Sequence, residues 1–279
     1  MKKITRRSFL AAAGLTAAAL ALTACGGSSS STASSTASSA AASSEAASSS
    51  AAAELTTVEA GKLTMATNAA FPPYEMTTDA GEFEGIDIET AQAIADKLGL
   101  ELQIDDMDFD AALLSVQQGK ADIVMAGVTV TDERKAVMDF SDSYATGIQS
   151  IIVPEGSDIA TPDDLAGKKI GTQRGTTGYI YCSDDFGDEN VVAYDDGLTA
   201  VQALNNGQVD AVVIDNAPAK EFVAANPGLV ILDTSYAEED YAIGMAKGSA
   251  LEDAINATLE ELKADGTLQS IVDKYITAE

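Results

Sequence analysis

The segment "GVTVTDERK" (residues 127–135) combines small, hydroxyl and charged residues directly after an apolar run. Gly127 would let a ligand approach the backbone closely, and Thr129 offers a hydroxyl group. Arg134 carries a guanidinium fork, which binds a carboxylate through two parallel hydrogen bonds in a way that lysine cannot copy. The residue types in this segment therefore indicate a carboxylate site.

Two further interpretations of this segment stay open. Arg134 could be a surface residue that pairs with Glu133 or Asp142, since most arginines lie at the surface. Either Thr131 or Asp132 could cap the short helix that carries Arg134. Arginine is otherwise rare here: after residue 25, Arg134 and Arg174 are the two that occur.

A second candidate anion site is "GTQRGTTGY" (171–179), in which Gly175 and Gly178 bracket Thr176 and Thr177. We expect a helix to begin there, and the free N–H groups of a helix N-terminus bind anions. The Gly-Lys-Ser/Thr sequence of a nucleotide-binding loop is absent from this segment. The site therefore suits a carboxylate better than a nucleotide.

An acid and two aromatic residues complete the set. Asp215 ends the apolar run "VVID", where it could accept an ammonium group or cap the next helix. Phe71 and Tyr74 flank a stiff Pro72–Pro73 turn, and they could face a ligand or fill the core. An arginine fork, an amide-rich helix start, one acid and aromatic surfaces are together what a free α-amino acid requires.

The elements that must position these residues alternate between strands and helices. The first set is a strand at 62–67, a helix at 85–99, a strand at 100–105, a helix at 109–120 and a strand at 121–127. The second set is a short helix at 161–167, strands at 168–175 and 191–195, a helix at 198–207, a strand at 209–215, a helix at 217–228 and a strand at 229–233. One more strand at 241–248 and two helices come next. This order predicts parallel α/β layers, in which ligands bind beyond the carboxyl ends of the strands.

The two sets also resemble each other in sequence. "QQGKADIVMAG" and "NNGQVDAVVID" each contain a helix end, a glycine, an aspartate and an apolar strand. Two similar α/β lobes that face each other would form a cleft between their strand ends.

Composition excludes several classes of function. The net charge of −28 would repel nucleic acid and disfavours docking on anionic lipid through a basic patch. There is no histidine, so Ser-His-Asp and Cys-His nucleophile systems are impossible. Without histidine or a CxxC motif, a transition metal would lack its usual ligands. We therefore predict no catalytic residue, no metal and no cofactor.

The N-terminus predicts export. Residues 1–25 combine a basic start with a short apolar stretch, as in a signal peptide. "LTAC" resembles the lipobox of bacterial lipoproteins, which implies that Cys25 carries palmitate or a similar lipid and anchors the protein to the outer face of the cell membrane. "TRRSFL" leaves open whether export follows the general or the twin-arginine route. Residues 26–59 are typical of a disordered Ser/Ala-rich tether, and Cys182 would have no disulfide partner.

The order of the lipobox, "ATNAAFPPYE", "GIDIETAQAIADKLG", "AGVTVTDERK", "GTTG" and "DAVVID" resembles the polar amino acid-binding lipoproteins of ABC importers. That group includes the glutamine-binding and the lysine/arginine/ornithine-binding proteins. The resemblance implies an α/β periplasmic-binding-protein fold of type II, with two lobes and two crossing hinge strands. We place lobe 1 at 60–147 plus 240–279 and lobe 2 at 150–237.

The resemblance also implies roles for the site residues. Arg134 would hold the α-carboxylate with Thr129 and the N–H groups near Thr176 and Thr177. The backbone of Gly127 and the carboxylate of Asp215 would hold the ammonium. The predicted ligand-binding residues are Asn68, Phe71, Tyr74, Phe109, Gly127, Thr129, Arg134, Gln173, Thr176, Thr177 and Asp215. Phe71 and Phe109 would sandwich the ligand side chain.

The sequence departs from these relatives at the predicted side-chain subsite. Relatives commonly carry Asp where this chain has Asn68, and the glutamine binders carry Lys and His where it has Gln173 and Ile214. Asn68, Gln173 and Glu75 are therefore the candidates for side-chain specificity. We expect a monomer that delivers a polar amino acid to the transmembrane subunits of a permease. A sensor ectodomain and a cyclohexadienyl dehydratase-like enzyme are the alternatives.

Overall fold

The computed structural model describes residues 55–276. The predicted signal peptide, the lipid site at Cys25 and most of the predicted tether lie outside this range. Within residues 55–276, no helix is both long enough and apolar enough to cross a bilayer.

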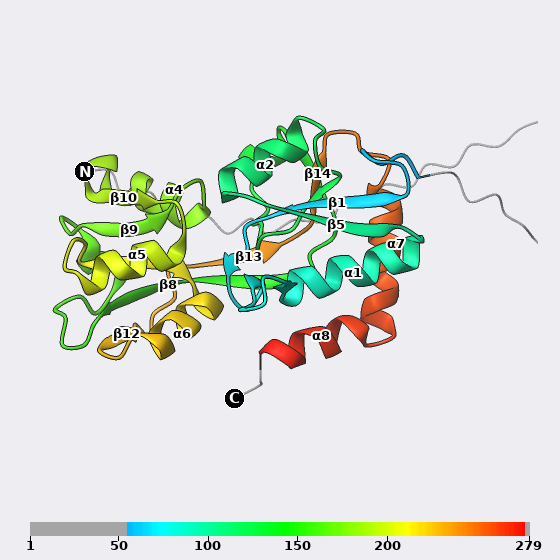
Figure 1. Cartoon of the computed structure of the whole chain (residues 1–279). Coiled ribbons are helices and arrows are strands. Elements are labelled where there is room, and N and C mark those ends of the chain that lie inside the picture. The colour runs from blue at the N-terminus through cyan, green and yellow to red at the C-terminus, as the bar shows by residue number, and fades with distance from the viewer. Residues whose placement is uncertain (1–54, 277–279) are drawn as a thin grey trace, which may run out of the picture. The chain divides into compact units, whose positions relative to one another are not determined.

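The first sheet contains five strands in the order β5-β1-β6-β14-β7 (Figure 1). Their bounds are β1 Lys62–Thr67, β5 Glu101–Asp106, β6 Ile123–Val124, β7 Met138–Phe140 and β14 Gly244–Ala246. Strand β1 pairs in parallel with both β5 and β6, as the alternating pattern predicts. Strand β14 pairs antiparallel with β6 and β7, so the sheet as a whole is mixed.

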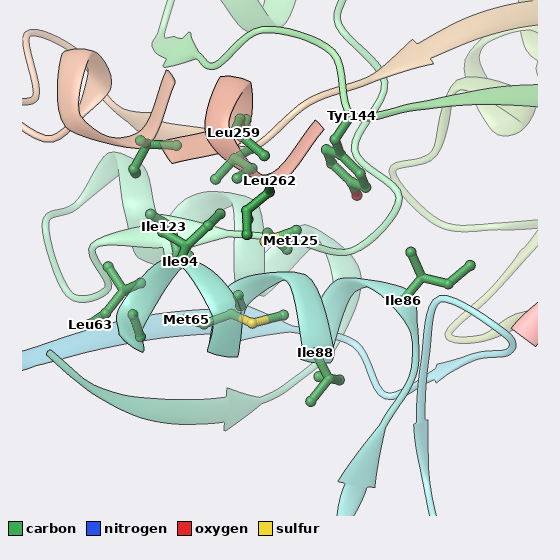
Figure 2. Close-up of a cluster of buried hydrophobic side chains, with 14 of the residues drawn as sticks. Leu63, Met65, Ile86, Ile88, Ile94, Ile123, Met125, Tyr144, Leu259 and Leu262 are labelled. Atoms are coloured by element: carbon green, nitrogen blue, oxygen red, sulfur yellow. The ribbon is translucent and has the colours of Figure 1, made fainter. Parts of the chain in front are cut away.

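Four helices belong with the first sheet. They are α1 Ile86–Leu98, α2 Phe109–Gln117, α7 Glu252–Ala264 and α8 Thr267–Tyr275. Helix α1 ends at Gly99, whose left-handed backbone favours glycine. Helices α7 and α8, although last in the chain, pack against α1. Figure 2 shows Leu259 and Leu262 of α7 beside Ile94 of α1 in the core of this sheet.

The second sheet has the order β10-β9-β11-β8-β12, with β13 also paired to β8. The strands are β8 Ala145–Pro154, β9 Ile170–Gln173, β10 Val191–Tyr194, β11 Ala211–Asp215, β12 Leu229–Ile231 and β13 Ala237–Tyr241. Its helices are α4 Thr177–Phe186, α5 Gly197–Asn205 and α6 Asn216–Ala225, with short 3-10 turns at η1 Pro162–Leu165 and η2 Asp188–Asn190. Cys182 of α4 is a buried free thiol within this core.

Two antiparallel strands connect the sheets. The chain passes from β7 into β8 and returns from β13 into β14, and Figure 1 shows β8 and β13 side by side. Glu239 of β13 is paired with Gly147 of β8 in this ladder. This arrangement confirms the α/β fold with crossing strands that the sequence resemblance implies.

In both sheets, an aspartate directly before a strand accepts hydrogen bonds from the backbone of the neighbouring strand. The Asp122 carboxylate, just before β6, accepts hydrogen bonds from the backbone N–H groups of Val58 (2.7 Å) and Thr64 (2.8 Å). The Asp210 carboxylate, just before β11, accepts one from the N–H of Lys169 (2.8 Å). Each aspartate therefore links the start of one strand to the start of its parallel neighbour.

Several predicted element boundaries were wrong. The strand expected at 121–127 is limited to β6, because the chain turns towards the cavity at Gly127, where φ is +56°. The strand expected at 241–248 is two strands, β13 and β14, which join different sheets. The helix expected at 161–167 is the single 3-10 turn η1.

Several elements of the fold were not predicted from the element pattern of the sequence. They are strands β7 and β8, the turn η2, and a small antiparallel sheet made of β2 Ala70–Phe71, β3 Glu75–Thr77 and β4 Phe83–Glu84. The short helix expected around Arg134 is present as α3 Asp132–Lys135.

Candidate functional site

One cavity gathers the strand ends of both sheets. It is lined by Asn68, Phe71, Glu75, Phe109, Ala126, Gly127, Thr129, Arg134, Gln149, Gln173, Thr176, Thr177, Val213, Ile214, Asp215 and Tyr241. Ten of the eleven predicted ligand-binding residues are in this set. The carboxyl ends of β1, β6, β9 and β11 all lead into the cavity, as expected for ligand sites in α/β sheets.

Tyr74 is the exception among the predicted residues. Its side chain is 4% exposed and belongs to the hydrophobic core of the first sheet. Its ring packs edge-on against Tyr241, with the ring centroids 5.4 Å apart, and stacks on Phe71 at 5.8 Å. Tyr74 therefore supports two residues that line the cavity and does not line it itself.

Arg134 lies in the short helix α3, and Thr131 is the residue that caps this helix. The Thr131 hydroxyl accepts a hydrogen bond from the Arg134 backbone N–H at 3.2 Å. The Arg134 side chain is 8% exposed. This burial excludes the alternative interpretation in which Arg134 is a surface residue. Burial lowers the pKa of the guanidinium from its usual value, yet arginine stays protonated in proteins. The helix cap therefore directs a buried positive charge into the cavity.

The guanidinium of Arg134 links the two sheets. Nη1 donates to the Thr129 carbonyl at 2.7 Å, and Nη2 donates to the Gly175 carbonyl at 3.2 Å. The guanidinium carbon lies 5.4 Å from the centroid of the Phe109 ring, within the range of a cation–π contact. These contacts fix the orientation of the fork in the cavity.

The start of helix α4 meets Arg134 from the second sheet. Thr176 caps this helix and accepts from the Tyr179 N–H at 3.3 Å. The Thr177 hydroxyl lies 3.4 Å from the Thr129 hydroxyl. A helix N-terminus carries partial positive charge. The arginine, two hydroxyl groups and the helix start therefore converge on one electropositive end of the cavity.

Asp215 supplies a second, electronegative end of the cavity. It stands at the N-cap position of α6, but its carboxylate accepts hydrogen bonds from the Tyr241 hydroxyl, the Ile148 N–H (3.4 Å) and the Gln149 side chain (3.4 Å). The side chain is 2% exposed. Burial raises the pKa of Asp215 to about 7. A cation placed beside it would therefore stabilise its ionised form.

A pair of neutral amides closes another side of the cavity. The Gln173 amide nitrogen donates to the Asn68 side-chain oxygen at 2.9 Å, and the Asn68 nitrogen donates to the Met107 carbonyl at 2.9 Å. Asn68 follows β1 of the first sheet, and Gln173 ends β9 of the second sheet. The amide pair therefore crosses between the sheets without adding a net charge.

Gly127 and Phe71 approach each other closely in the cavity wall. A β-carbon built on Gly127 would lie 2.9 Å from the Phe71 ring, and the positive φ of Gly127 is strained for other residues. The Gly127 N–H donates to the Asp87 carboxylate at 3.0 Å. These contacts explain why glycine is required at this position.

Three polar residues of the site, Gln149, Tyr241 and Glu239, were not predicted. Glu239 is buried, and its carboxylate accepts from the Thr129 hydroxyl (3.1 Å) and from the Gln149 amide (3.0 Å). All three lie on the crossing strands β8 and β13. Gln149 could have been found from the sequence, because it interrupts the apolar run "GIQSIIV". A polar residue inside a buried strand needs a hydrogen-bonding partner.

No group of three or more metal-binding side chains is arranged to hold a metal ion among residues 55–276. Burial raises the pKa of the Cys182 thiol to about 12, so this sulfur is protonated at neutral pH.

Comparison with known proteins shows the family and the fold of the chain. Residues 63–278 match the model of the bacterial extracellular solute-binding proteins, family 3. The L-cystine-binding protein TcyJ of Escherichia coli is 33% identical over 226 residues, which are 79% of this chain and 85% of TcyJ.

Two solved structures share the fold, which is that of type II periplasmic binding proteins. An ancestral arginine-binding protein bound to glutamine has a TM-score of 0.75 and 41% identity over 78% of this chain and 99% of its own. The arginine-, lysine-, histidine-binding protein ArtJ of Geobacillus stearothermophilus has a TM-score of 0.75 and 33% identity over 78% of this chain and 96% of its own. The chain belongs to the bacterial extracellular solute-binding proteins of family 3.

Proposed function

We propose that the cavity binds a free polar amino acid and that the protein delivers it to an ABC-type permease. The observation that carries this proposal is the pairing of opposite charges in one cavity. Arg134 and Asp215 both line the cavity, and each is less than a tenth exposed. A buried arginine, together with a buried carboxyl group whose ionised form an ammonium would stabilise, matches the two charges of a zwitterion.

The carboxylate of the ligand would bind at the electropositive end. Arg134 would supply its fork, and the N–H groups at the start of α4 would complete the contact. The Thr129 and Thr177 hydroxyl groups lie beside this position. A rigid guanidinium needs little reordering on binding, because Thr129 and Gly175 already hold it.

The ammonium of the ligand would bind to Asp215 and to the Gly127 backbone. Both lie in the cavity wall: Asp215 ends β11 of the second sheet, and Gly127 follows β6 of the first. A ligand that contacts both would therefore favour a closed arrangement of the two lobes. We assign residues 60–147 and 240–279 to lobe 1 and residues 150–237 to lobe 2, because α7 and α8 pack on α1.

The ligand side chain would lie between Phe71 and Phe109 and reach the amides of Asn68 and Gln173. Because this amide pair is neutral, we expect a neutral polar amino acid, with a basic one second. The named ligands of the relatives support this class, since they include cystine, glutamine and arginine. We propose a binding role without catalysis.

The location of the protein is inferred from its N-terminal sequence. We propose that residues 1–25 are a lipoprotein signal peptide and that Cys25 carries the lipid that anchors the protein to the outer face of the cell membrane. The tether at 26–59 would then give the binding domain reach to the permease.

A thermal-shift screen tests the proposed ligand class. The candidates are the twenty common amino acids with ornithine, citrulline and cystine. A ligand at about 100 times its dissociation constant should stabilise the protein by roughly 2.7 kcal/mol, which raises the melting temperature by roughly 5–10 °C. A shift with a sugar, peptide or dicarboxylate and with no free amino acid would reject the proposed site.

A further inference from the structure

Two carboxyl groups are buried together behind the cavity wall. Glu75 of β3 and Asp87 of α1 are both 0% exposed, and Glu75 also borders the cavity. The backbone N–H of Asp87 donates to the carbonyl of Tyr74, the residue before Glu75, at 2.9 Å, and the nearby Asp87 carboxyl group raises the pKa of Glu75. The two oxygens of Glu75 accept no hydrogen bond from an N–H or hydroxyl donor within residues 55–276.

A hydrogen bond between two carboxyl groups requires a proton, because two carboxylates have no donor between them. Two negative charges this close in a buried site would also repel each other strongly. Apart from each other, Asp106 acts on Glu75 and Tyr144 acts on Asp87, and neither of these neighbours is a cation. The surroundings therefore favour one shared proton and one net negative charge.

The pKa values agree with this geometry. Burial raises the pKa of Asp87 to about 6, against the effect of its hydrogen bond from Gly127. Burial and the neighbouring Asp87 raise the pKa of Glu75 well above its usual value. Above about pH 6, protonated Glu75 is thus the donor and ionised Asp87 is the acceptor.

Asp87 connects this pair to the cavity. Its second oxygen accepts the Gly127 N–H at 3.0 Å, which fixes the peptide at the point where the chain turns after β6. We propose that Glu75 and Asp87 share one proton and that the resulting pair acts as a positioning device for the Gly127 backbone. This step rests on the proposed function, in which the Gly127 backbone contacts the ammonium of the ligand.

The shared proton has a measurable signature in stability. A group whose pKa is raised on folding binds its proton more tightly in the folded protein. Its contribution is complete below the usual glutamate pKa of about 4.3 and declines as pH rises towards the folded value. Glu75→Gln removes this titration but keeps a donor for Asp87.

The test compares ligand-free melting temperatures at pH 5 and pH 8. Relative to the wild-type protein, Glu75→Gln should gain about 3–5 °C for each pH unit over this range. The matched control is Glu260→Gln, which makes the same substitution at an exposed position of α7 and should show a constant difference. If the melting-temperature difference between Glu75→Gln and the wild-type protein is also the same at pH 5 and pH 8, the proposal of a shared proton is wrong, whatever ligand the protein binds.

The positioning role is tested with the amino acid found in the screen. Asp87→Asn keeps an oxygen that can accept the Gly127 N–H, whereas Asp87→Leu does not. Calorimetry at pH 7 should give a loss of affinity of about tenfold or more for Asp87→Leu and a clearly smaller loss for Asp87→Asn. Equal affinity in the two variants would overturn the positioning role. If Asp87→Leu does not fold, an affinity of Asp87→Asn more than about tenfold below wild type would overturn it.

Discussion

The two sheets use the same arrangement of elements to present opposite charges. In each, a glycine with positive φ follows the end of a helix, an aspartate fixes the next strand, and the chain leaves that strand at the cavity. After β6 the chain continues through Gly127 to Arg134, whereas β11 ends directly in Asp215. The similar scaffolds therefore differ in the residues that come after the strand.

Under the proposed function, this difference would let one protein hold both ends of a zwitterion. A positive charge needs a longer side chain and a helix to direct it, which the Thr131-capped turn provides. A negative charge needs only the last residue of a strand, held by Tyr241 and Gln149. Variants at each end test whether the two ends act as assigned.

The largest effect is expected at the electropositive end. Arg134→Lys should keep the fold and reduce amino acid affinity by about 10- to 150-fold, because a charged hydrogen-bonded contact contributes roughly 1.5–3 kcal/mol. Calorimetry measures this loss. Arg174→Lys is the matched control, because Arg174 is exposed and pairs with Asp195, and its affinity should be unchanged. Unchanged affinity within about twofold in Arg134→Lys would reject the role of Arg134.

A smaller and pH-dependent effect is expected at the electronegative end. The ligand ammonium favours ionised Asp215, whose pKa is about 7 without ligand. Wild-type affinity should therefore rise with pH up to about pH 7, by at most about tenfold per unit, and then level off.

Asp215→Asn should remove this rise. Its affinity should be about tenfold below wild type at pH 8 and closer to wild type at pH 5, where Asp215 is itself protonated. Calorimetry at four pH values between 5 and 8 measures how the affinity of each protein changes with pH. If the affinities of the wild-type protein and Asp215→Asn change with pH in the same way, Asp215 does not bind the ammonium of the ligand.

The smallest effect concerns the scaffold. Asp122→Ala should cost about 2 kcal/mol of unfolding free energy, because the buried carboxylate accepts two backbone N–H groups. Asp210→Ala should cost about 1 kcal/mol, because this exposed residue accepts one. Urea denaturation gives both values. If Asp210→Ala lowers the unfolding free energy more than Asp122→Ala does, the stabilising effect of these aspartates does not follow the number of backbone N–H groups that each accepts.

The sequence predicted the parts of the site that come after regular strands. Arg134, Thr129 and Asp215 could be found because the ends of apolar strands in α/β sheets converge on ligand sites. The alternation of strands and helices also indicated most of the element order.

The parts that were not predicted depend on tertiary contacts. Gln149 and Tyr241 lie in strands that cross between the sheets, and their roles depend on pairing with residues far away in sequence. Tyr74 was misplaced because an aromatic residue beside a proline turn can face a ligand or the core equally well. Glu75 and Asp87 each look like ordinary acids until the fold buries them together.

The most direct test of the two-ended site uses modified ligands. Calorimetry would compare the best amino acid from the screen with its α-amide and its N-acetyl derivative, all with the wild-type protein. Each derivative leaves one buried charge unpaired, at a cost of roughly 3–5 kcal/mol. Both should therefore bind at least about 100-fold more weakly than the free amino acid. Binding of either derivative within a few-fold of the free amino acid would contradict the assignment of Arg134 and Asp215 to the two ends of the ligand.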